Sequence, residues 1–182
     1  CDQAEESNCG FDGTCDGAQA CRYWNTDTVC KDQSCNDHIK DPTNYCDGVG
    51  ACINPDDVDC EPYVCNEAGD ECLFSCQIDL HCMNLYYCEG QSCVPKKENG
   101  ETCGGGNECI SKNCVDGYCC DTPCSGACET CAFENLEGTC TPYVEATDPE
   151  QECGTCMMCD GASACIVVPD GDDPFTHCTE SD

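Results

Sequence analysis

Cysteine is the residue type in this sequence with the most evident chemistry. Cys128 and Cys131 form one C-x2-C pair, and Cys153 and Cys156 form a second. Two such pairs are typical of a zinc ribbon, in which four thiolates bind one Zn²⁺. A single pair can also be a dithiol–disulfide redox centre when a helix N-terminus lowers the thiol pKa. Among 29 cysteines such pairs also arise by chance, so we favour structural disulfides over these two alternatives.

Carboxylates are the second group that could bind a ligand. They gather in two short clusters on loops, Asp56, Asp57 and Asp59 in the first and Asp170, Asp172 and Asp173 in the second. Hard oxygen ligands of this kind suit calcium, although neither cluster follows the EF-hand pattern. We favour solvated acidic turns for both clusters and keep weak calcium binding at these aspartates as the alternative.

Residues for catalysis are not recognisable. The three histidines, His38, His81 and His177, lie in unrelated contexts and form no evident triad with serine or cysteine. No C-x-x-C-H motif is present, so haem attachment of the cytochrome c type is not expected. The sequence predicts a protein that is not an enzyme, with no catalytic and no cofactor-binding residues.

One cysteine pattern, C-x5-C-x4/5-C-x4-C, occurs twice in succession in the central part of the chain. Disulfides between these cysteines would hold that part in place. The cysteines of the pattern are Cys76, Cys82, Cys88 and Cys93, followed by Cys103, Cys109, Cys114 and Cys119. An acidic residue and a glycine, Glu89-Gly90 and Asp116-Gly117, lie between the third and fourth cysteine of each copy. Such dipeptides favour tight reversals between strands. The pattern predicts two disulfide-stapled hairpin modules, whose pairing the spacing leaves open.

A second repeat has the form C-D-G-x-x-A-C. It occurs at Cys15–Cys21, Cys46–Cys52 and Cys159–Cys165. Each copy predicts a narrow Asp-Gly turn that disulfides either close or flank.

Composition defines the fold class. Leu, Ile, Val and Phe supply only 22 of 182 residues and the net charge is −31, a combination that normally indicates disorder. The 29 cysteines change this conclusion, because each disulfide stabilises by about 2–4 kcal/mol and can replace a hydrophobic core. No window has helical periodicity, and the apolar residues occur in short extended pieces. We therefore expect a small disulfide-rich fold of short β-hairpins and irregular loops, with little or no helix and no large core.

The expected architecture is an elongated array of tandem modules that cannot share one core. The module boundaries lie near stretches without cysteine, which gives residues 1–72, 73–120, 121–145 and 146–182. The larger aromatic residues are expected to pack as lids over disulfides; these are Trp24, Phe74, Tyr86, Tyr87 and Phe133.

Cysteine usage also predicts the compartment. Disulfides at this density persist outside the reducing cytosol, so an extracellular or cell-surface location is expected. No apolar run approaches 18 residues, so no membrane insertion is expected. Because the cysteine count is odd, one thiol must stay free, bond to another molecule or carry lipid. Cys1 and Cys178 are the leading candidates for the unpaired or intermolecular cysteine, because they lie near the ends of the sequence. Lipid could modify Cys1, although an ordinary disulfide at a module boundary is the favoured interpretation over a lipid-bearing residue.

Charge limits the partners. Asp and Glu total 37 against 6 Lys and Arg, so phosphate groups of nucleic acids and anionic membranes would be repelled. The expected partners are divalent cations, other copies of the chain and other surface proteins. Self-assembly should depend on salt, because charge at this density opposes close packing of copies unless it is screened.

Several segments resemble a known kind of protein. CDGAQACRYW (15–24), NGETCGGGNECISKNCVDGYCCDTPCSGACETC (99–131) and EGTCTPY (137–143) are similar to cysteine-rich tandem modules of secreted and surface proteins from myxobacteria and related bacteria. The hairpin pairs also resemble, more loosely, the cysteine-rich domains of Dickkopf type. The resemblance implies a bacterial surface or extracellular origin and a repeat architecture, and it implies no residue-specific activity.

These observations favour a non-enzymatic structural protein that assembles into a fibre, sheath or surface layer. The first alternative is a monomeric adhesion or binding module for a protein or glycan. The second is an extracellular redox or zinc protein.

Overall fold

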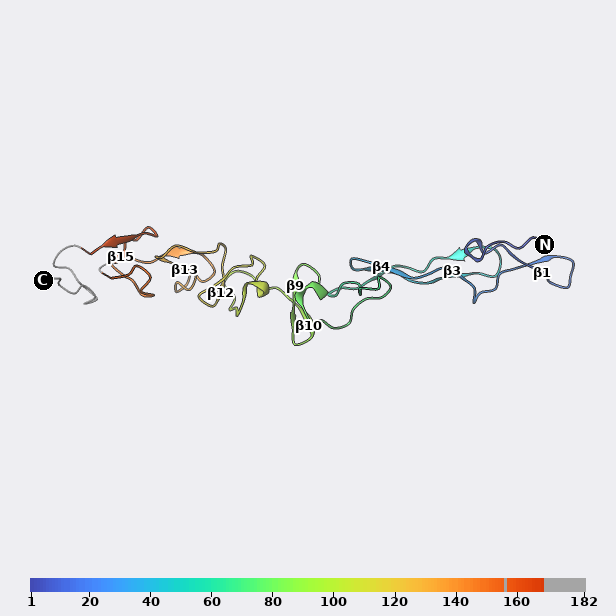
Figure 1. Ribbon diagram of the computed structural model, residues 1–182, viewed down its shortest axis with the longest axis horizontal. Coiled ribbons are helices and arrows are strands. Elements are labelled where there is room, and N and C mark those ends of the chain that lie inside the picture. Colours follow the sequence, from blue (N-terminus) through green and yellow to red (C-terminus); the bar gives the residue numbers. More distant parts are fainter. Residues whose placement is uncertain (156, 169–182) are drawn as a thin grey trace. The chain divides into compact units, whose positions relative to one another are not determined.

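The computed structural model describes residues 1–155 and 157–168 of the chain, and two compact units can be distinguished. The first unit comprises Cys1–Val94 and the second begins at Pro95. Within the described residues every strand belongs to a sheet of two or three short strands, and the helical elements are three 3₁₀ turns of three residues each. Figure 1 shows these short hairpins, joined by irregular loops. The predicted small disulfide-rich class is confirmed.

The first unit contains two hairpins and two three-stranded sheets. One hairpin pairs β1 (Phe11–Cys15) with β2 (Cys21–Tyr23), and the other pairs β9 (Tyr86–Glu89) with β10 (Ser92–Pro95). The order of the first three-stranded sheet is β3 (Val29–Lys31), β6 (Asn44–Cys46), β7 (Cys52–Ile53). The order of the second is β4 (Ser34–Asn36), β5 (Ile39–Asp41), β8 (Val58–Asp59). The 3₁₀ turns of this unit are η1 (Glu6–Asn8) and η2 (Asp79–His81).

The second unit contains three hairpins in its described part. They pair β11 (Cys114–Val115) with β12 (Tyr118–Cys119), β13 (Glu129–Thr130) with β14 (Thr141–Pro142), and β15 (Met157–Cys159) with β16 (Cys165–Val167). The remaining 3₁₀ turn is η3 (Gly106–Glu108). Strands this short are marginal alone in water, so other bonds must hold them.

Sulfur fills the interior of both units. Among the described residues, every large side chain that is less than 2% exposed belongs to cysteine. The buried clusters are also built from cysteines, for example Cys9, Cys30 and Cys46 with Trp24 packed against them. The expectation of no large hydrophobic core agrees with this arrangement, because disulfides occupy the positions that Leu, Ile and Val usually take.

Most of the aromatic side chains expected to cover disulfides are at least partly buried, and one is not. Trp24 packs on the Cys9 cluster, Tyr86 packs on the cluster of Cys76, Cys82 and Cys93, and Tyr87 is only 4% exposed. Phe133 is partly buried. Phe74, in contrast, is 88% exposed, so its assignment as a lid is wrong.

Disulfides cross two of the module boundaries that the sequence suggests. Cys120 bonds to Cys131 across the boundary at 120/121, and Cys128 bonds to Cys159 across that at 145/146. Sequence spacing cannot show such links, because a boundary without cysteine can still lie between two cysteines that pair.

No helix among the described residues is long and apolar enough to span a membrane.

Candidate functional sites

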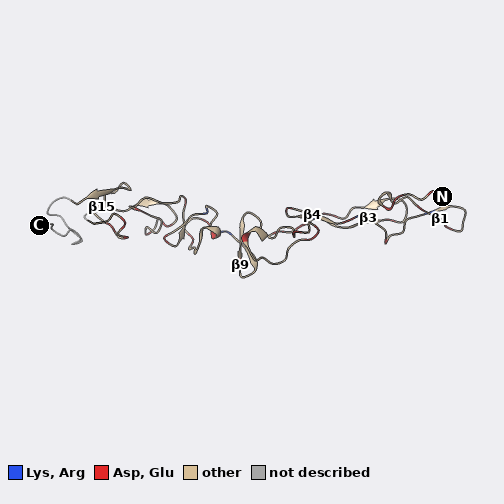
Figure 2. Ribbon diagram, in the orientation of Figure 1, with Lys and Arg blue, Asp and Glu red and all other residues tan. Residues whose placement is uncertain are grey.

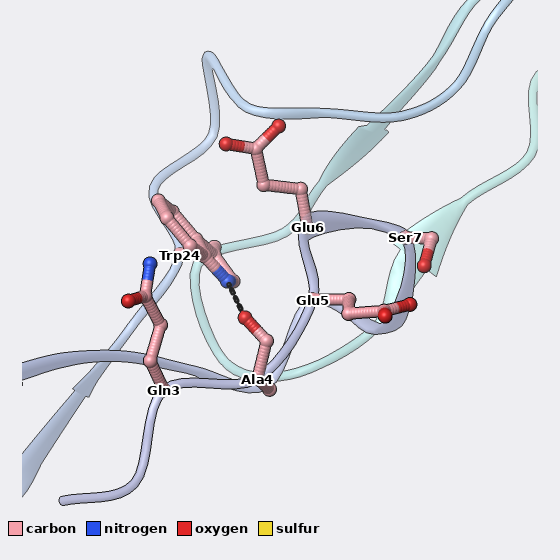
Figure 3. Close-up of a pocket in the computed structure, with 6 residues that line it drawn as sticks. All are labelled: Gln3, Ala4, Glu5, Glu6, Ser7 and Trp24. Carbon is pink, nitrogen blue, oxygen red and sulfur yellow. Dashed lines mark hydrogen bonds between the residues drawn. The ribbon is translucent and has the colours of Figure 1, made fainter.

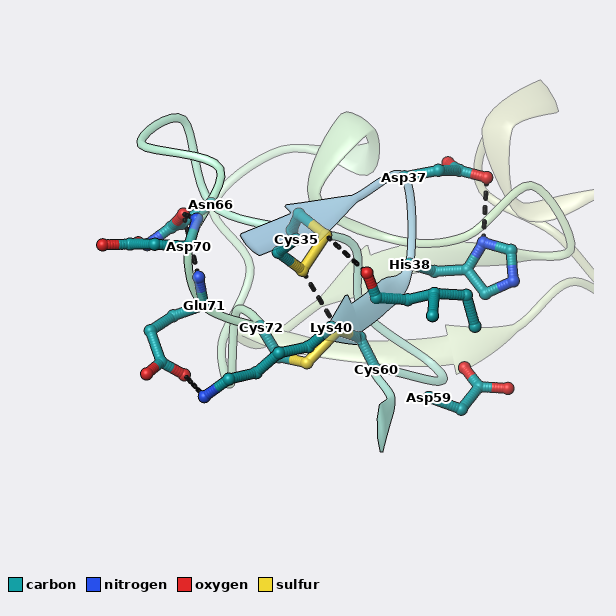
Figure 4. Close-up of a disulfide and its surroundings, with 12 residues drawn as sticks. Cys35, Asp37, His38, Lys40, Asp59, Cys60, Asn66, Asp70, Glu71 and Cys72 are labelled. Atoms are coloured by element: carbon teal, nitrogen blue, oxygen red, sulfur yellow. Dashed lines mark hydrogen bonds and ion pairs between the residues drawn. A yellow bond between two sulfur atoms is a disulfide. The ribbon is translucent and has the colours of Figure 1, made fainter. Parts of the chain in front are cut away.

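Thirteen disulfides join 26 of the cysteines in the described residues, and many of them pack against a second disulfide. In at least five places among the described residues, three sulfurs from two different disulfides lie within 4.8 Å of one another. Figure 4 shows one such place, where the Sγ of Cys35, bonded to Cys65, lies 3.7 Å from the Sγ of Cys60, bonded to Cys72. Contacts of this kind bury one disulfide against another and provide each small core.

The eight predicted framework cysteines are all bonded, in the same crossed order in both copies. In the first hairpin module Cys76 bonds to Cys88 and Cys82 to Cys93. In the second module the bonds join the corresponding residues, Cys103 to Cys114 and Cys109 to Cys119. The backbone repeats as well, because Cys76 N–H donates to Gln91 and Cys103 N–H donates to Gly117. The two modules are therefore structural copies, one in each unit.

The two C-x2-C pairs do not come together as a zinc ribbon. Cys128 bonds to Cys159, Cys131 bonds to Cys120 and Cys153 bonds to Cys165, while Cys156 lies outside the described residues. The Sγ atoms of Cys128 and Cys153 do approach to 3.1 Å. In the oxidised chain, however, each sulfur is bonded to another sulfur and offers no thiolate to a metal.

The three C-D-G-x-x-A-C loops share one geometry. In the loop at residues 46–52, the Oδ1 atom of Asp47 accepts hydrogen bonds from the N–H groups of Val49 (2.8 Å) and Ala51 (2.9 Å). The other two loops place the same two bonds on Oδ1 of Asp16 and Oδ1 of Asp160. In each loop these hydrogen bonds lower the pKa of the aspartate below its ordinary value. The largest effect comes from the N–H of Ala51 on Asp47, of Ala18 on Asp16 and of Ala164 on Asp160. The repeated aspartate thus holds the turn through two backbone hydrogen bonds, an arrangement that we call the aspartate bracket.

The two cysteines of each loop face each other but do not bond to each other. Cys15 pairs with Cys21 in the strand register, as Cys46 does with Cys52 and Cys159 with Cys165. The bonds run outward instead, as in Cys9–Cys46 and Cys30–Cys52. Disulfides therefore flank these turns and do not close them.

The choice of Cys1 as an unpaired or intermolecular cysteine is wrong, and the interpretation of Cys1 as an ordinary disulfide cysteine is confirmed. Cys1 bonds to Cys21, and the cysteine without a bond in the described residues is the exposed Cys15. The Sγ of Cys15 lies 3.8 Å from the Sγ of Cys1, so three sulfurs meet where two can bond. Cys178 lies outside the described residues.

The predicted calcium ligands can be described only in part. Asp56 and Asp57 are exposed, and Asp59 is exposed as well, with its Oδ1 accepting the N–H of Glu61. Asp170, Asp172 and Asp173 lie outside the described residues. Calcium binding at these aspartates stays a prediction.

Two surface pockets have distinct chemistry. Figure 3 shows the first, of about 460 Å³, where Gln3, Glu5, Glu6 and Ser7 surround Trp24, whose indole N–H donates to the Ala4 carbonyl. The second, of about 340 Å³, is lined by four carboxylates, those of Asp116, Glu129, Glu150 and Glu152. Burial first, and then the charges of Glu150, Asp116 and Asp148, raise the pKa of Glu152. The pKa shift of Glu152 is thus opposite in direction to the pKa shifts of Asp16, Asp47 and Asp160.

No protein family, curated protein or solved structure matches this chain.

Proposed function

We propose that the protein is an extracellular structural scaffold that assembles into a fibre, sheath or surface layer. Its disulfide-stapled fold is compatible with an extracellular structural or binding module. One observation carries the proposal. The buried side chains of the described residues are mostly disulfide-bonded cysteines, whereas many large apolar side chains are exposed to solvent. The origin we propose is a bacterial surface, in line with the tandem modules that the sequence resembles.

Exposed apolar side chains supply the attraction between copies. Within the segment that includes the first hairpin module, Phe74 is 88% exposed, Leu80 81% and Leu85 62%. Burial of such side chains against another copy is worth about 25 cal/mol per Å² of apolar surface. These exposed side chains could therefore be buried in contacts between copies of the chain.

Open sheet edges supply a second means of contact. Each sheet of the described residues has two or three strands, so its outer strands have one side outside the sheet. Neighbouring loops already bond part of that side in β12, where Cys119 N–H donates to Glu101, and in β15, where Ala146 N–H donates to Cys159. Strand addition at such edges joins chains without any specific pocket.

Charge sets the condition for assembly. Four of the six basic residues are paired within their own units, through Arg22 with Asp12, Lys31 with Asp41, Lys40 with Glu71 and Lys97 with Glu108. Acidic residues, in contrast, recur along the chain in both units (Figure 2). Copies therefore repel one another until salt or divalent cations screen the carboxylates.

Negative-stain electron microscopy of native protein that was never exposed to reductant tests the proposal. We expect regular filaments or sheets in calcium-containing buffer, and their dissociation on chelation at low ionic strength. Dispersed small particles under all conditions would contradict self-assembly. Assembly that ignores both salt and chelator would contradict its electrostatic control.

The Trp24 pocket favours the alternative function, a monomeric module that binds a protein or glycan. An indole beside carboxylates and an amide offers both a flat apolar face and polar groups to a ligand. Trp24 is the single tryptophan of the chain, so its fluorescence reports on this pocket directly. A saturable change on titration with a glycan, lost in Trp24→Phe and kept in Gln33→Ala, would favour binding over assembly.

A further inference from the structure

The first of the three C-D-G-x-x-A-C loops lacks a bond that the other two possess. The first cysteine of the second loop, Cys46, bonds to Cys9, which lies 37 residues earlier. The first cysteine of the third loop, Cys159, bonds to Cys128, 31 residues earlier. The equivalent residue of the first loop is Cys15, which is exposed and has no bond in the described chain.

The rest of the first loop conforms to the repeat. Its last cysteine, Cys21, bonds to the earlier Cys1, just as Cys52 bonds to Cys30 and Cys165 bonds to Cys153. The aspartate bracket is also complete, with Ala18 and Ala20 donating to Asp16. Among the cysteines of the repeat, the missing one is therefore the cysteine that corresponds to Cys9 and Cys128.

The glycine that follows the aspartate gives independent evidence for a missing segment. A Cβ atom placed on Gly48 would lie 3.5 Å from Thr26, and one on Gly161 would lie 3.4 Å from Glu145. A Cβ on the equivalent Gly17 would meet nothing within 4 Å. The loops of the second and third repeats are thus covered by another piece of chain, while the first loop is open.

The covering segments and the missing sulfur belong together. Thr26 lies between Cys9 and Cys30, and Glu145 lies between Cys128 and Cys153. Two residues beyond each of them, a threonine carbonyl accepts the N–H of the loop's first cysteine, in Cys46 to Thr28 (3.0 Å) and Cys159 to Thr147 (2.8 Å). A single segment therefore supplies the sulfur, the cover and the backbone bond in both complete repeats.

The first unit has no cysteine left to bond to Cys15. The other fourteen cysteines of residues 1–94 are all bonded among themselves. We propose that Cys15 forms a disulfide with a cysteine of a second copy of this chain, whose flanking segment covers the first loop as residues 9–30 cover the second. The link itself follows from the repeat geometry, and only the choice of a second copy rests on the proposed function.

The chemistry of the link is an ordinary oxidation. The thiols of Cys15 and of its partner lose two protons and two electrons in forming the S–S bond. A low-molecular-weight disulfide of the extracellular medium takes them up and becomes two thiols. Because the Sγ of Cys1 is 3.8 Å from that of Cys15, exchange could move the outgoing bond to Cys1 or Cys21, so the test must locate it.

Peptide mapping of native protein purified without reductant decides the matter. Free thiols are first blocked with N-ethylmaleimide in denaturant, and the protein is then digested without reduction. We expect the Cys15 peptide unblocked and joined to a second peptide from residues 1–182, in species that migrate above the monomer on non-reducing gels. Blocked Cys15, or an outgoing bond from Cys1 or Cys21, would overturn the proposal. So would a partner peptide within a monomer or one whose sequence lies outside residues 1–182.

Variants separate this link from assembly in general. Cys15→Ser removes a thiol that no bond within its unit needs, so the fold should persist while the covalent species disappear. Ser7→Cys in the Cys15→Ser background provides an exposed thiol on the same unit without the loop around it. Covalent species that return with Ser7→Cys would show that Cys15 has no special partner. Filaments that Cys15→Ser still forms, now dissociated by detergent, would support both the scaffold and its covalent link.

Discussion

The loop aspartates show how one side chain can hold a turn in a chain without a core. Asp47 accepts from two backbone N–H groups through a single oxygen, and the N–H of Asp47 itself donates to Ala51. A carboxylate that accepts backbone hydrogen bonds in this way replaces water as their acceptor and stabilises the folded turn.

Replacement of this aspartate should destabilise its loop. Asp47→Ala removes the acceptor of both bonds and should lower the thermal midpoint of unfolding, while Asp47→Asn keeps an oxygen and should have a smaller effect. Asp32→Ala is the matched control, because Asp32 is an exposed aspartate of the same unit. Equal shifts for Asp47→Ala and Asp32→Ala in calorimetry would mean that the two hydrogen bonds to Asp47 contribute nothing.

The same aspartates predict a loss of stability in acid. Their folded-state pKa values are depressed, by the N–H of Ala51 first for Asp47, of Ala18 for Asp16 and of Ala164 for Asp160. Their contribution is therefore complete above the ordinary aspartate pKa and is lost as the pH falls through the depressed values. Thermal midpoints across this acidic range should fall less steeply for the triple Asp→Asn variant than for the native chain.

Glu152 provides the control of opposite sign. Its folded pKa is raised, so its ionisation opposes folding at neutral pH and its protonation removes that penalty. Glu152→Gln should thus raise the thermal midpoint at neutral pH, and the gain should vanish in acid. A gain that persists unchanged at low pH would show that the charge of Glu152 is not its cause.

At the scale of the element, the two hairpin modules are a natural comparison of turn residues. Both turns have two successive residues with positive φ, Asp116 (51°) and Gly117 (81°) in one and Gly90 (55°) and Gln91 (72°) in the other. This is the type I′ pattern, which favours glycine at the second of the two positions. The second module has glycine there, whereas the first has glutamine.

Gln91→Gly should therefore stabilise the first hairpin. It removes a side chain from the left-handed region, where a residue other than glycine costs on the order of 1 kcal/mol. Amide exchange in residues 86–95 should slow in the variant. Ser92→Gly, one residue later within β10, should have the opposite effect, since glycine weakens a strand. Faster exchange in Gln91→Gly would contradict the assignment of strain to this position.

These turns also show how far the sequence predicts the elements. The reversal between the third and fourth cysteines follows from residue type alone, and Asp116-Gly117 is the observed turn. Glu89-Gly90 is one residue early, because Glu89 is the last residue of β9. In both modules the turn occupies the second and third residues after the third cysteine, whether or not glycine stands at the second turn position. Residue types alone therefore do not fix where the turn falls.

At the scale of the whole molecule, disulfides replace the hydrophobic core, and the fold should depend on them throughout. Reduction without denaturant should abolish the hairpins in both units, because each bond contributes about 2–4 kcal/mol and little buried hydrocarbon remains. Far-ultraviolet circular dichroism with and without a phosphine reductant measures this, and reoxidation provides the control. A native spectrum in the fully reduced chain would contradict a core of sulfur.

Pairing is also where the sequence stops being informative. Composition alone predicts that cysteines staple short hairpins, since no other residue type could stabilise them. Which cysteines bond depends on distances between segments far apart in the sequence, as in Cys9–Cys46 and Cys128–Cys159. The choice of Cys1 as the unpaired residue was wrong for this reason, because its position near a terminus carries no information on which sulfurs lie nearby.

The crossed order of the bonds has a consequence for biosynthesis. A chain that enters an oxidising compartment N-terminus first exposes Cys76 and Cys82 together before Cys88 arrives, so an oxidase that joins cysteines in order of appearance makes a wrong bond. The native bonds, Cys76–Cys88 and Cys82–Cys93, then require reshuffling through mixed disulfides. The same order recurs in the second hairpin module. Efficient production therefore calls for a host that supplies a disulfide isomerase as well as an oxidase.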